Sequence, residues 1–193
     1  MSEVVAVDEV RGRGARIERG RRFLLAGPPD PGLITGTWRI ADRYVQGTRL
    51  RLRAVHRAGD GRRYYELTQQ IPPPRDVQVP RGVRGLVTNI YLDVAEYERL
   101  AGLAGAMLVK TRHSVPPFGV DVFEGPLAGL VLAETDFESD SSCAAFIPPL
   151  DGRARIITEV TGDPRFSGEC LAMATAAQLR VILDEFGLSP PSP

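Results

Sequence analysis

Basic and apolar residues alternate along one short segment of the chain, RLRLR at positions 49–53. Acidic residues alternate in the same way farther along, at Glu134, Asp136 and Glu138. Successive side chains of a β-strand point to opposite faces, so each alternation predicts a strand with one charged face. One basic and one acidic strand face favour a β structure in which the two kinds of charge share a site.

Strand-like runs recur along the whole chain, and Gly, Pro or Asp stands at most of the breaks between them. They span 16–26, 33–44, 48–56, 63–71, 85–92, 107–115, 119–123 and 129–138. Helical patterns are fewer. This balance predicts an α+β chain, mostly antiparallel β, built as a large sheet or barrel with helices packed outside.

Two segments carry a clear helical pattern. The first begins after Asp93, a candidate N-cap, and its mixed apolar face comprises Ala95, Tyr97, Leu100 and Leu103. The second spans 167–187, with Ser167 as its cap and Gly187 at its end. Its predicted buried stripe comprises Leu171, Ala174, Leu179, Ile182 and Phe186. A weaker helical turn is expected at 141–146, and a mobile flap or a surface insertion without a role at 72–85.

The chain of 193 residues has the size of one domain, expected at 14–187 between a flexible leader (1–13) and a disordered tail (188–193). Its 24 Lys and Arg residues equal its 24 Asp and Glu residues, so no global charge favours a nucleic-acid partner. No long apolar run predicts a membrane partner, and Cys143 and Cys170 match neither a disulfide framework nor a metal site. We expect a soluble, cytoplasmic protein, and the sequence leaves the oligomeric state open.

The alternating charges suit a triphosphate bound with a divalent cation. Arginine offers a planar fork that binds phosphate through two hydrogen bonds, and the segment 49–53 presents three such side chains. Carboxylates two residues apart on a strand have Cα atoms about 6.5–7 Å apart, so Glu134 and Asp136 are spaced to share a cation. Hard cations such as Mg²⁺ prefer oxygen ligands of this kind.

Two further segments fit the same chemistry. Lys110 and Arg112 form a second basic pair on one strand face, and Glu18, Gly20 and Arg22 lie on one face of the first strand. A barrel of about eight strands can hold one small ligand in a polar interior. The alternative for each segment is an ordinary strand whose charged side chains face solvent.

The chain resembles the CYTH superfamily of triphosphate tunnel metalloenzymes over about 15–172. The resemblance is carried by KTRHSV at 110–115, by VDVFEGPLAGLVLAETDFE at 120–138 and by EVTGDPRFSG at 159–168. IERGRRFLL at 17–25 is similar to the opening strand of that superfamily. The resemblance implies a closed eight-stranded antiparallel barrel, a tunnel whose interior binds a triphosphate with Mg²⁺ or Mn²⁺.

The resemblance also implies roles for individual residues. Glu18 and Arg22 match the first and last members of the opening Glu-x-Glu-x-Lys signature, with Gly20 in the place of its middle acid. The implied ligands of the triphosphate are Arg22, Arg49, Arg51, Arg53, Lys110 and Arg112. The implied ligands of the metal are Glu18, Glu134 and Asp136. No catalytic base is implied.

Two functions follow from these residues. The first is a metal-dependent hydrolase of inorganic triphosphate or an organic triphosphate, acting on phosphoanhydride bonds. The second is a non-catalytic module of the same fold that binds triphosphate or polyphosphate, which Gly20 favours, as do Gln70 in place of a lysine and the added negative charge of Glu66. A structural domain with an empty interior is a third alternative.

Overall fold

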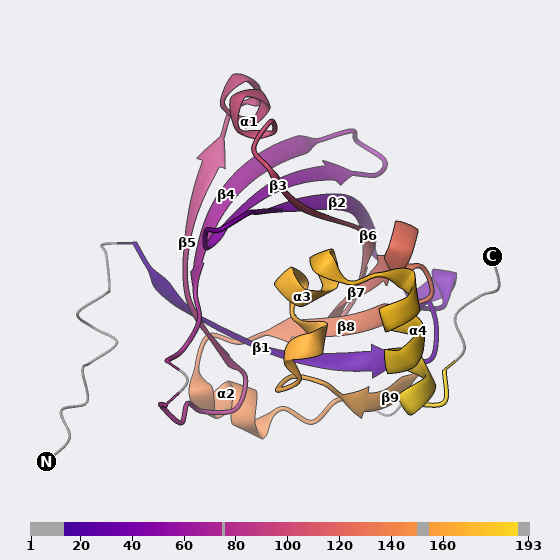
Figure 1. The fold of residues 1–193 in the computed structure, drawn as a ribbon. Coiled ribbons are helices and arrows are strands. Elements are labelled where there is room, and N and C mark those ends of the chain that lie inside the picture. The colour runs from indigo at the N-terminus through magenta and orange to yellow at the C-terminus, as the bar shows by residue number, and fades with distance from the viewer. Residues whose placement is uncertain (1–13, 75, 150–154, 189–193) are drawn as a thin grey trace, which may run out of the picture.

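Eight strands of the computed structural model form a closed antiparallel barrel, seen as a ring in Figure 1. The structure describes residues 14–74, 76–149 and 155–188. Neighbouring strands follow the order β5-β4-β3-β2-β6-β7-β8-β1, and pairing between β1 and β5 closes the ring. The strands are β1 (Arg16–Leu25), β2 (Gly36–Val45), β3 (Leu50–Arg57), β4 (Arg63–Ile71), β5 (Val83–Leu92), β6 (Gly105–Val115), β7 (Phe118–Phe123) and β8 (Val131–Asp136).

The predicted fold class is therefore confirmed, and each of the eight predicted strand segments overlaps one barrel strand. A ninth strand, β9 (Ile156–Glu159), was not predicted and pairs with the second half of β1. Its four residues give too short a run for an alternating pattern to stand out. The predicted leader (1–13) and residues 189–193 of the predicted tail lie outside the described residues.

The helices differ from the prediction in detail. They are α1 (Val94–Leu100), α2 (Asp140–Ala145), α3 (Gly168–Met173) and α4 (Ala176–Glu185), with short 3-10 turns η2 (Pro31–Leu33), η3 (Gly125–Leu127) and η4 (Pro164–Phe166). Asp93 caps α1 as predicted, but no residue of α1 is buried, so its apolar face is not part of a core. The predicted 72–85 connection is shorter, because β5 already begins at Val83.

The single C-terminal helix that the sequence predicts is divided into α3 and α4. Ser167 caps α3 as expected, and Gly187 follows α4 with a φ of +68°. The helix is interrupted at Thr175. The Thr175 side chain accepts a hydrogen bond from the Gln178 backbone and so caps the start of α4. Leu171 and Leu179 are buried as predicted.

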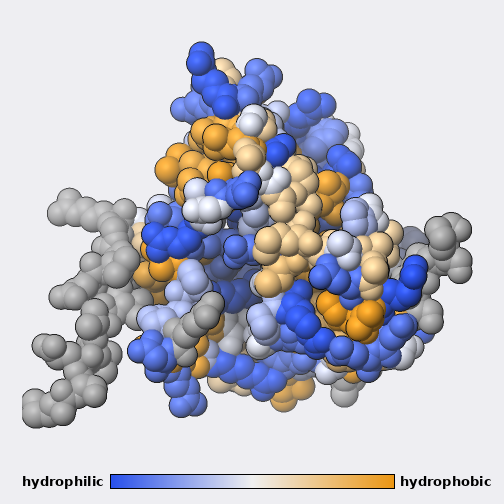
Figure 2. All heavy atoms as spheres, in the orientation of Figure 1, coloured by the Kyte–Doolittle hydropathy of each residue, from blue (hydrophilic) through white to orange (hydrophobic). Residues whose placement is uncertain are grey.

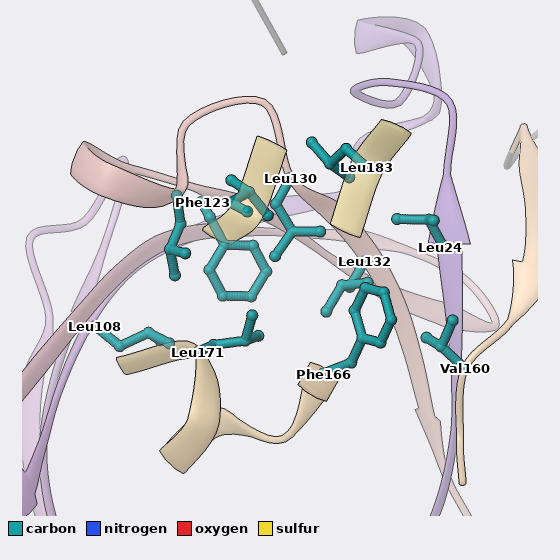
Figure 3. Close-up of a cluster of buried hydrophobic side chains, with 11 residues drawn as sticks. Leu24, Leu108, Phe123, Leu130, Leu132, Val160, Phe166, Leu171 and Leu183 are labelled. Carbon is teal, nitrogen blue, oxygen red and sulfur yellow. The ribbon is translucent and has the colours of Figure 1, made fainter. Parts of the chain in front are cut away.

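The inward face of the barrel has an apolar end and a charged middle. Leu24, Leu108 and Leu132 are buried two residues along their strands from the charged Arg22, Lys110 and Glu134, and therefore lie on the same face. They pack with Phe166 of η4 and Leu171 of α3 in one apolar cluster (Figure 3). The helices thus cover one end of the barrel interior, and α3 is drawn across the ring in Figure 1.

A second apolar cluster packs on the opposite face of β1, β7 and β8. It comprises Phe23, Leu25, Phe118, Val120, Val131 and Ala133, together with Val115 at the end of β6. These three strands are thus fixed on both faces, which holds their inward charged residues in register. Among the described helices, none is long and apolar enough to cross a membrane.

Candidate functional site

A cavity of about 880 Å³ occupies the charged part of the barrel interior. Figure 2 shows hydrophilic residues deep in the hollow beside α3. Every residue that the sequence singled out as a ligand of phosphate or metal lines this cavity. These residues are Glu18, Arg22, Arg49, Arg51, Arg53, Lys110, Arg112, Glu134 and Asp136. Strand alternation thus brings both kinds of charge to one place.

The basic strand β3 is held by acids on its two neighbours. Arg53 donates two hydrogen bonds to Asp42 of β2, at 2.6 and 2.8 Å. Arg51 is held less firmly: its Nη2 donates to Thr68 at 3.0 Å and lies 3.4 Å from Glu66 of β4. Its Nε has no hydrogen-bond partner in the described chain. Arg51 therefore keeps a free donor.

Arg49 occupies a different position from the other predicted arginines. It precedes β3, which begins at Leu50, and its side chain is exposed although it lines the cavity. Gln70 also lines the cavity, near the end of β4. These two residues belong to the rim of the site and not to its buried network.

A second network of ion pairs crosses β1, β6, β7 and β8. Lys110 donates to Asp121 at 2.6 Å, and Arg112 binds the same carboxylate through two hydrogen bonds of 2.6 Å. Arg112 also reaches Glu134 at 2.6 Å, and Arg22 donates to the other oxygen of Glu134 at 2.6 Å. Both oxygens of Glu134 are thus occupied by guanidinium groups.

The sequence did not single out Asp42 or Asp121, although each anchors part of the network. Asp42 stands opposite Arg53 across the β2–β3 pair, and Asp121 stands opposite Arg112 across the β6–β7 pair. Each is a lone acid in an otherwise apolar or mixed strand, so no repeated acidic pattern marks it. The register of the two hairpins would identify them, because it places each acid opposite an arginine.

Asp42 and Glu134 stay ionised because nearby cations outweigh the effect of burial. Burial raises the pKa of Asp42, but the charge and hydrogen bonds of Arg53, with the charges of Arg51 and Lys110, outweigh it and lower that pKa to about 2. Burial likewise raises the pKa of Glu134, and the charges of Arg22, Lys110 and other cations hold it well below its usual range. For Lys110 burial wins over the attraction of Asp121, and its pKa is lowered.

The two remaining predicted acids lie nearer the barrel rim. Asp136 stands opposite Gly20 on β1, and its side chain is 73% exposed. Glu18 stands opposite Gly85 on β5. Arg84, which was not predicted, also lines the cavity, with its Nη1 3.9 Å from Asp136.

Arg84 faces the cavity because the strand register is irregular there. Glu18 pairs with Gly85 while the next residue, Arg19, pairs with Val83, so Arg84 is one extra residue on β5. Such a bulge reverses the alternation of the strand on either side of it. A prediction based on strict alternation therefore misses this arginine.

The described acids do not assemble a metal centre. Within residues 14–74, 76–149 and 155–188, no group of three His, Cys, Asp or Glu side chains is spaced to hold a metal ion. Glu134, Asp136 and Glu18 share the cavity, but Glu134 gives both oxygens to arginines and Asp136 faces Arg84. Mg²⁺ needs several oxygen ligands in near-octahedral geometry, which these residues do not offer as they stand.

A closed eight-stranded antiparallel barrel with buried arginines around an internal cavity is the architecture that the resemblance to triphosphate tunnel metalloenzymes implies. No protein-family model matches the chain. Over 92 residues it is 37% identical to an inorganic triphosphatase of Nitrosomonas europaea, an alignment that covers 45% of this chain and 58% of that relative.

Two solved structures share the fold over most of the chain. One, described as the hypothetical protein NE1496, has a TM-score of 0.51 and 28% identity, covering 82% of this chain and 99% of the other. The second, described as the inorganic triphosphatase NE1496, has a TM-score of 0.50 and 27% identity, covering 81% and 95%. With the barrel and its charged interior, these similarities support the resemblance to the CYTH superfamily.

Proposed function

We propose that the chain binds inorganic triphosphate or an organic triphosphate inside the barrel and hydrolyses a phosphoanhydride bond. The observation that carries this proposal is the buried ion-pair network around the cavity. Five cations on its inward strands, Arg22, Arg51, Arg53, Lys110 and Arg112, pair with four carboxylates, Asp42, Glu66, Asp121 and Glu134. The network keeps one cation in excess, which favours an anionic ligand. The similarity to an inorganic triphosphatase supports the same ligand class.

The carboxylates prepare the arginines for phosphate. Asp42 and Asp121 fix the guanidinium groups of Arg53 and Arg112 in orientation before a ligand arrives, so little reorganisation is needed when phosphate binds. The free Nε of Arg51 offers a donor that no described side chain uses. Positioning and charge neutralisation of this kind account for much of the catalysis of phosphoryl transfer.

We further propose that Mg²⁺ or Mn²⁺ reaches the cavity bound to the triphosphate, as part of the substrate. The lack of a three-acid cluster among the described residues supports this form of metal dependence over a resident metal. A bound divalent ion neutralises phosphate charge and polarises a phosphoryl oxygen.

Phosphate release from tripolyphosphate tests the proposal. We expect turnover that increases when Mg²⁺ or Mn²⁺ is added, and a loss of about tenfold or more in Arg51→Gln, because a charge-assisted phosphate contact is removed. Arg62→Gln is the control, since Arg62 is exposed outside the cavity. Absence of phosphate release from tripolyphosphate and from a panel of nucleoside triphosphates, with either metal, contradicts the proposed hydrolysis.

A second candidate function is binding without hydrolysis. The observation that favours it is Gly20, which offers no carboxylate opposite Asp136. Isothermal titration calorimetry separates the two functions, because tight binding of tripolyphosphate without phosphate release selects the binding module.

A further inference from the structure

Arg84 is the least neutralised of the arginines that line the inner cavity wall. Its Nη2 is buried and has no hydrogen-bond partner among the described residues. The one carboxylate beside it, Asp136, is 3.9 Å from Nη1, beyond hydrogen-bond distance. Arg22, Arg53 and Arg112, in contrast, each reach a carboxylate at 2.6 Å. A buried guanidinium N–H without an acceptor is costly, so this group is arranged for a ligand that supplies one.

The guanidinium of Arg84 fills the space that a side chain at position 20 would occupy. A Cβ at Gly20 would lie 2.5 Å from Arg84 Nη2 and 2.7 Å from an oxygen of Asp136. The guanidinium therefore occupies the position that a longer residue 20 would take, at the point where β1 faces Asp136. Arg84 is also one of the cations that depress the pKa of Glu134, so it lies within electrostatic reach of both acids.

We propose that Arg84 is a fixed cation that replaces a divalent metal ion at this end of the cavity, so that triphosphate binds there without metal. The inference rests on the proposed triphosphate function and adds a residue and a cation requirement to it. Nη2 of Arg84 donates to a phosphate oxygen, and its charge neutralises the phosphate where a metal ion would otherwise be needed. Gly20 is the enabling residue, because any side chain there collides with the guanidinium.

The surrounding residues explain why a cation is needed at this place. Glu18 and Asp136 line the same part of the cavity and repel an entering phosphate. An arginine beside Asp136 offsets one of these two negative charges without requiring a metal of fixed geometry.

Calorimetric titration of tripolyphosphate into the full chain, in EDTA and in Mg²⁺, tests the inference. We expect the wild-type Kd to change less than about threefold between the two buffers. Arg84→Gln should weaken binding in EDTA by about 10- to 100-fold, because a hydrogen bond to a charged group contributes about 1.5–3 kcal/mol. Arg62→Gln, at an exposed arginine outside the cavity, should leave both values unchanged.

The double variant Gly20→Glu with Arg84→Gln supplies the converse test. Removing the guanidinium frees the space beside Gly20, and the new carboxylate then faces Asp136, whose exposed side chain can shift. This variant should bind tripolyphosphate in Mg²⁺ at least about tenfold more tightly than in EDTA. Thermal melting of each variant establishes that it is folded.

The outcomes separate the inference from the function on which it rests. Wild-type binding that collapses in EDTA overturns the inference while leaving the triphosphate function standing. The inference also fails if folded Arg84→Gln binds tripolyphosphate in EDTA as tightly as wild type. Absence of tripolyphosphate binding in both buffers overturns the proposed function itself.

Discussion

Arg53 and Asp42 illustrate how single residues hold charge inside this barrel. The Asp42 side chain is 1% exposed and that of Arg53 16%, and two hydrogen bonds join them. A buried pair of this kind gains little net stability, because desolvation offsets attraction, yet removing one partner costs about 3–5 kcal/mol. The pair therefore fixes the direction of a guanidinium more than it stabilises the fold.

Acid should destabilise the folded protein because it protonates the buried carboxylate of Asp42. The folded-state pKa of Asp42, about 2, lies below the value near 3.9 of an unfolded aspartate. Its contribution is thus fully present above about pH 4 and is lost as the pH falls through about 2, on the order of 2 kcal/mol. Urea denaturation between pH 5 and 2 measures this loss, which Asp42→Asn should reduce. Glu98→Gln, at an exposed residue of α1, is the control. Parallel pH profiles for wild type and folded Asp42→Asn contradict the prediction.

Strand alternation predicted most of the charged residues that line the cavity. Arg51, Arg53, Lys110 and Arg112 repeat at every second position, and the structure places them on one inward face. Their counter-charges were not visible in the same way, because Asp42 stands alone in its strand and only the hairpin register joins it to Arg53. The roles assigned to these residues in binding stay predictions.

At the scale of elements, the bulge in β5 places an arginine, Arg84, in the cavity wall. Gly85 has a φ of +125°, and a Cβ there would lie 2.1 Å from the Ile71 carbonyl oxygen. Only glycine fits this close approach of strands, and the extra residue beside it, Arg84, turns inward. Periodicity alone predicts neither feature, since it assumes an unbroken register.

Gly85→Ala should lower the free energy of unfolding by at least about 2 kcal/mol. The substitution forces an L side chain into a positive φ and against the backbone of β4. Gly102→Ala is the matched control, because nothing lies within 4 Å of its added Cβ. Urea denaturation of both variants measures the difference, and equal stabilities would show that the bulge is not constrained as described.

The sequence contains a motif that marks the break between α3 and α4. Thr175 and Gln178 form a capping box in which each side chain bonds the backbone of the other residue. An apolar stripe that continues across such a motif suggests one helix, although the cap starts another. Leu183, buried in α4, was missing from the predicted stripe, although it lies four residues after Leu179 on the same helix face.

At the scale of the whole molecule, the barrel depends on the helices that close its apolar end. Gly168 begins α3, and a Cβ at this residue would lie 1.8 Å from the Tyr44 hydroxyl oxygen. This contact sets how closely α3 packs against β2 and β6 and therefore how much of the interior stays open. The sequence predicted helices outside the barrel and did not indicate that one of them packs against inward-facing leucines.

Gly168→Ala should destabilise the protein by about 1–3 kcal/mol by pushing α3 away from Tyr44. Tyr44→Phe removes the nearest atom, so the double variant should recover part of this loss. A double-mutant cycle of unfolding free energies measures the coupling between the two positions. Strictly additive effects would mean that α3 does not rest on the tyrosine.

The closing strand pair has a consequence for a chain still being made on the ribosome. β1 is synthesised first, yet Arg22 stands opposite Glu134, 112 residues later, and Arg16 stands opposite Val87. Such distant pairings form slowly, and until they form the incomplete sheet exposes open edges that invite aggregation. A nascent fragment that ends before β8 lacks Glu134 and the closing β1–β8 pair, so we expect it to lack the complete ligand cavity.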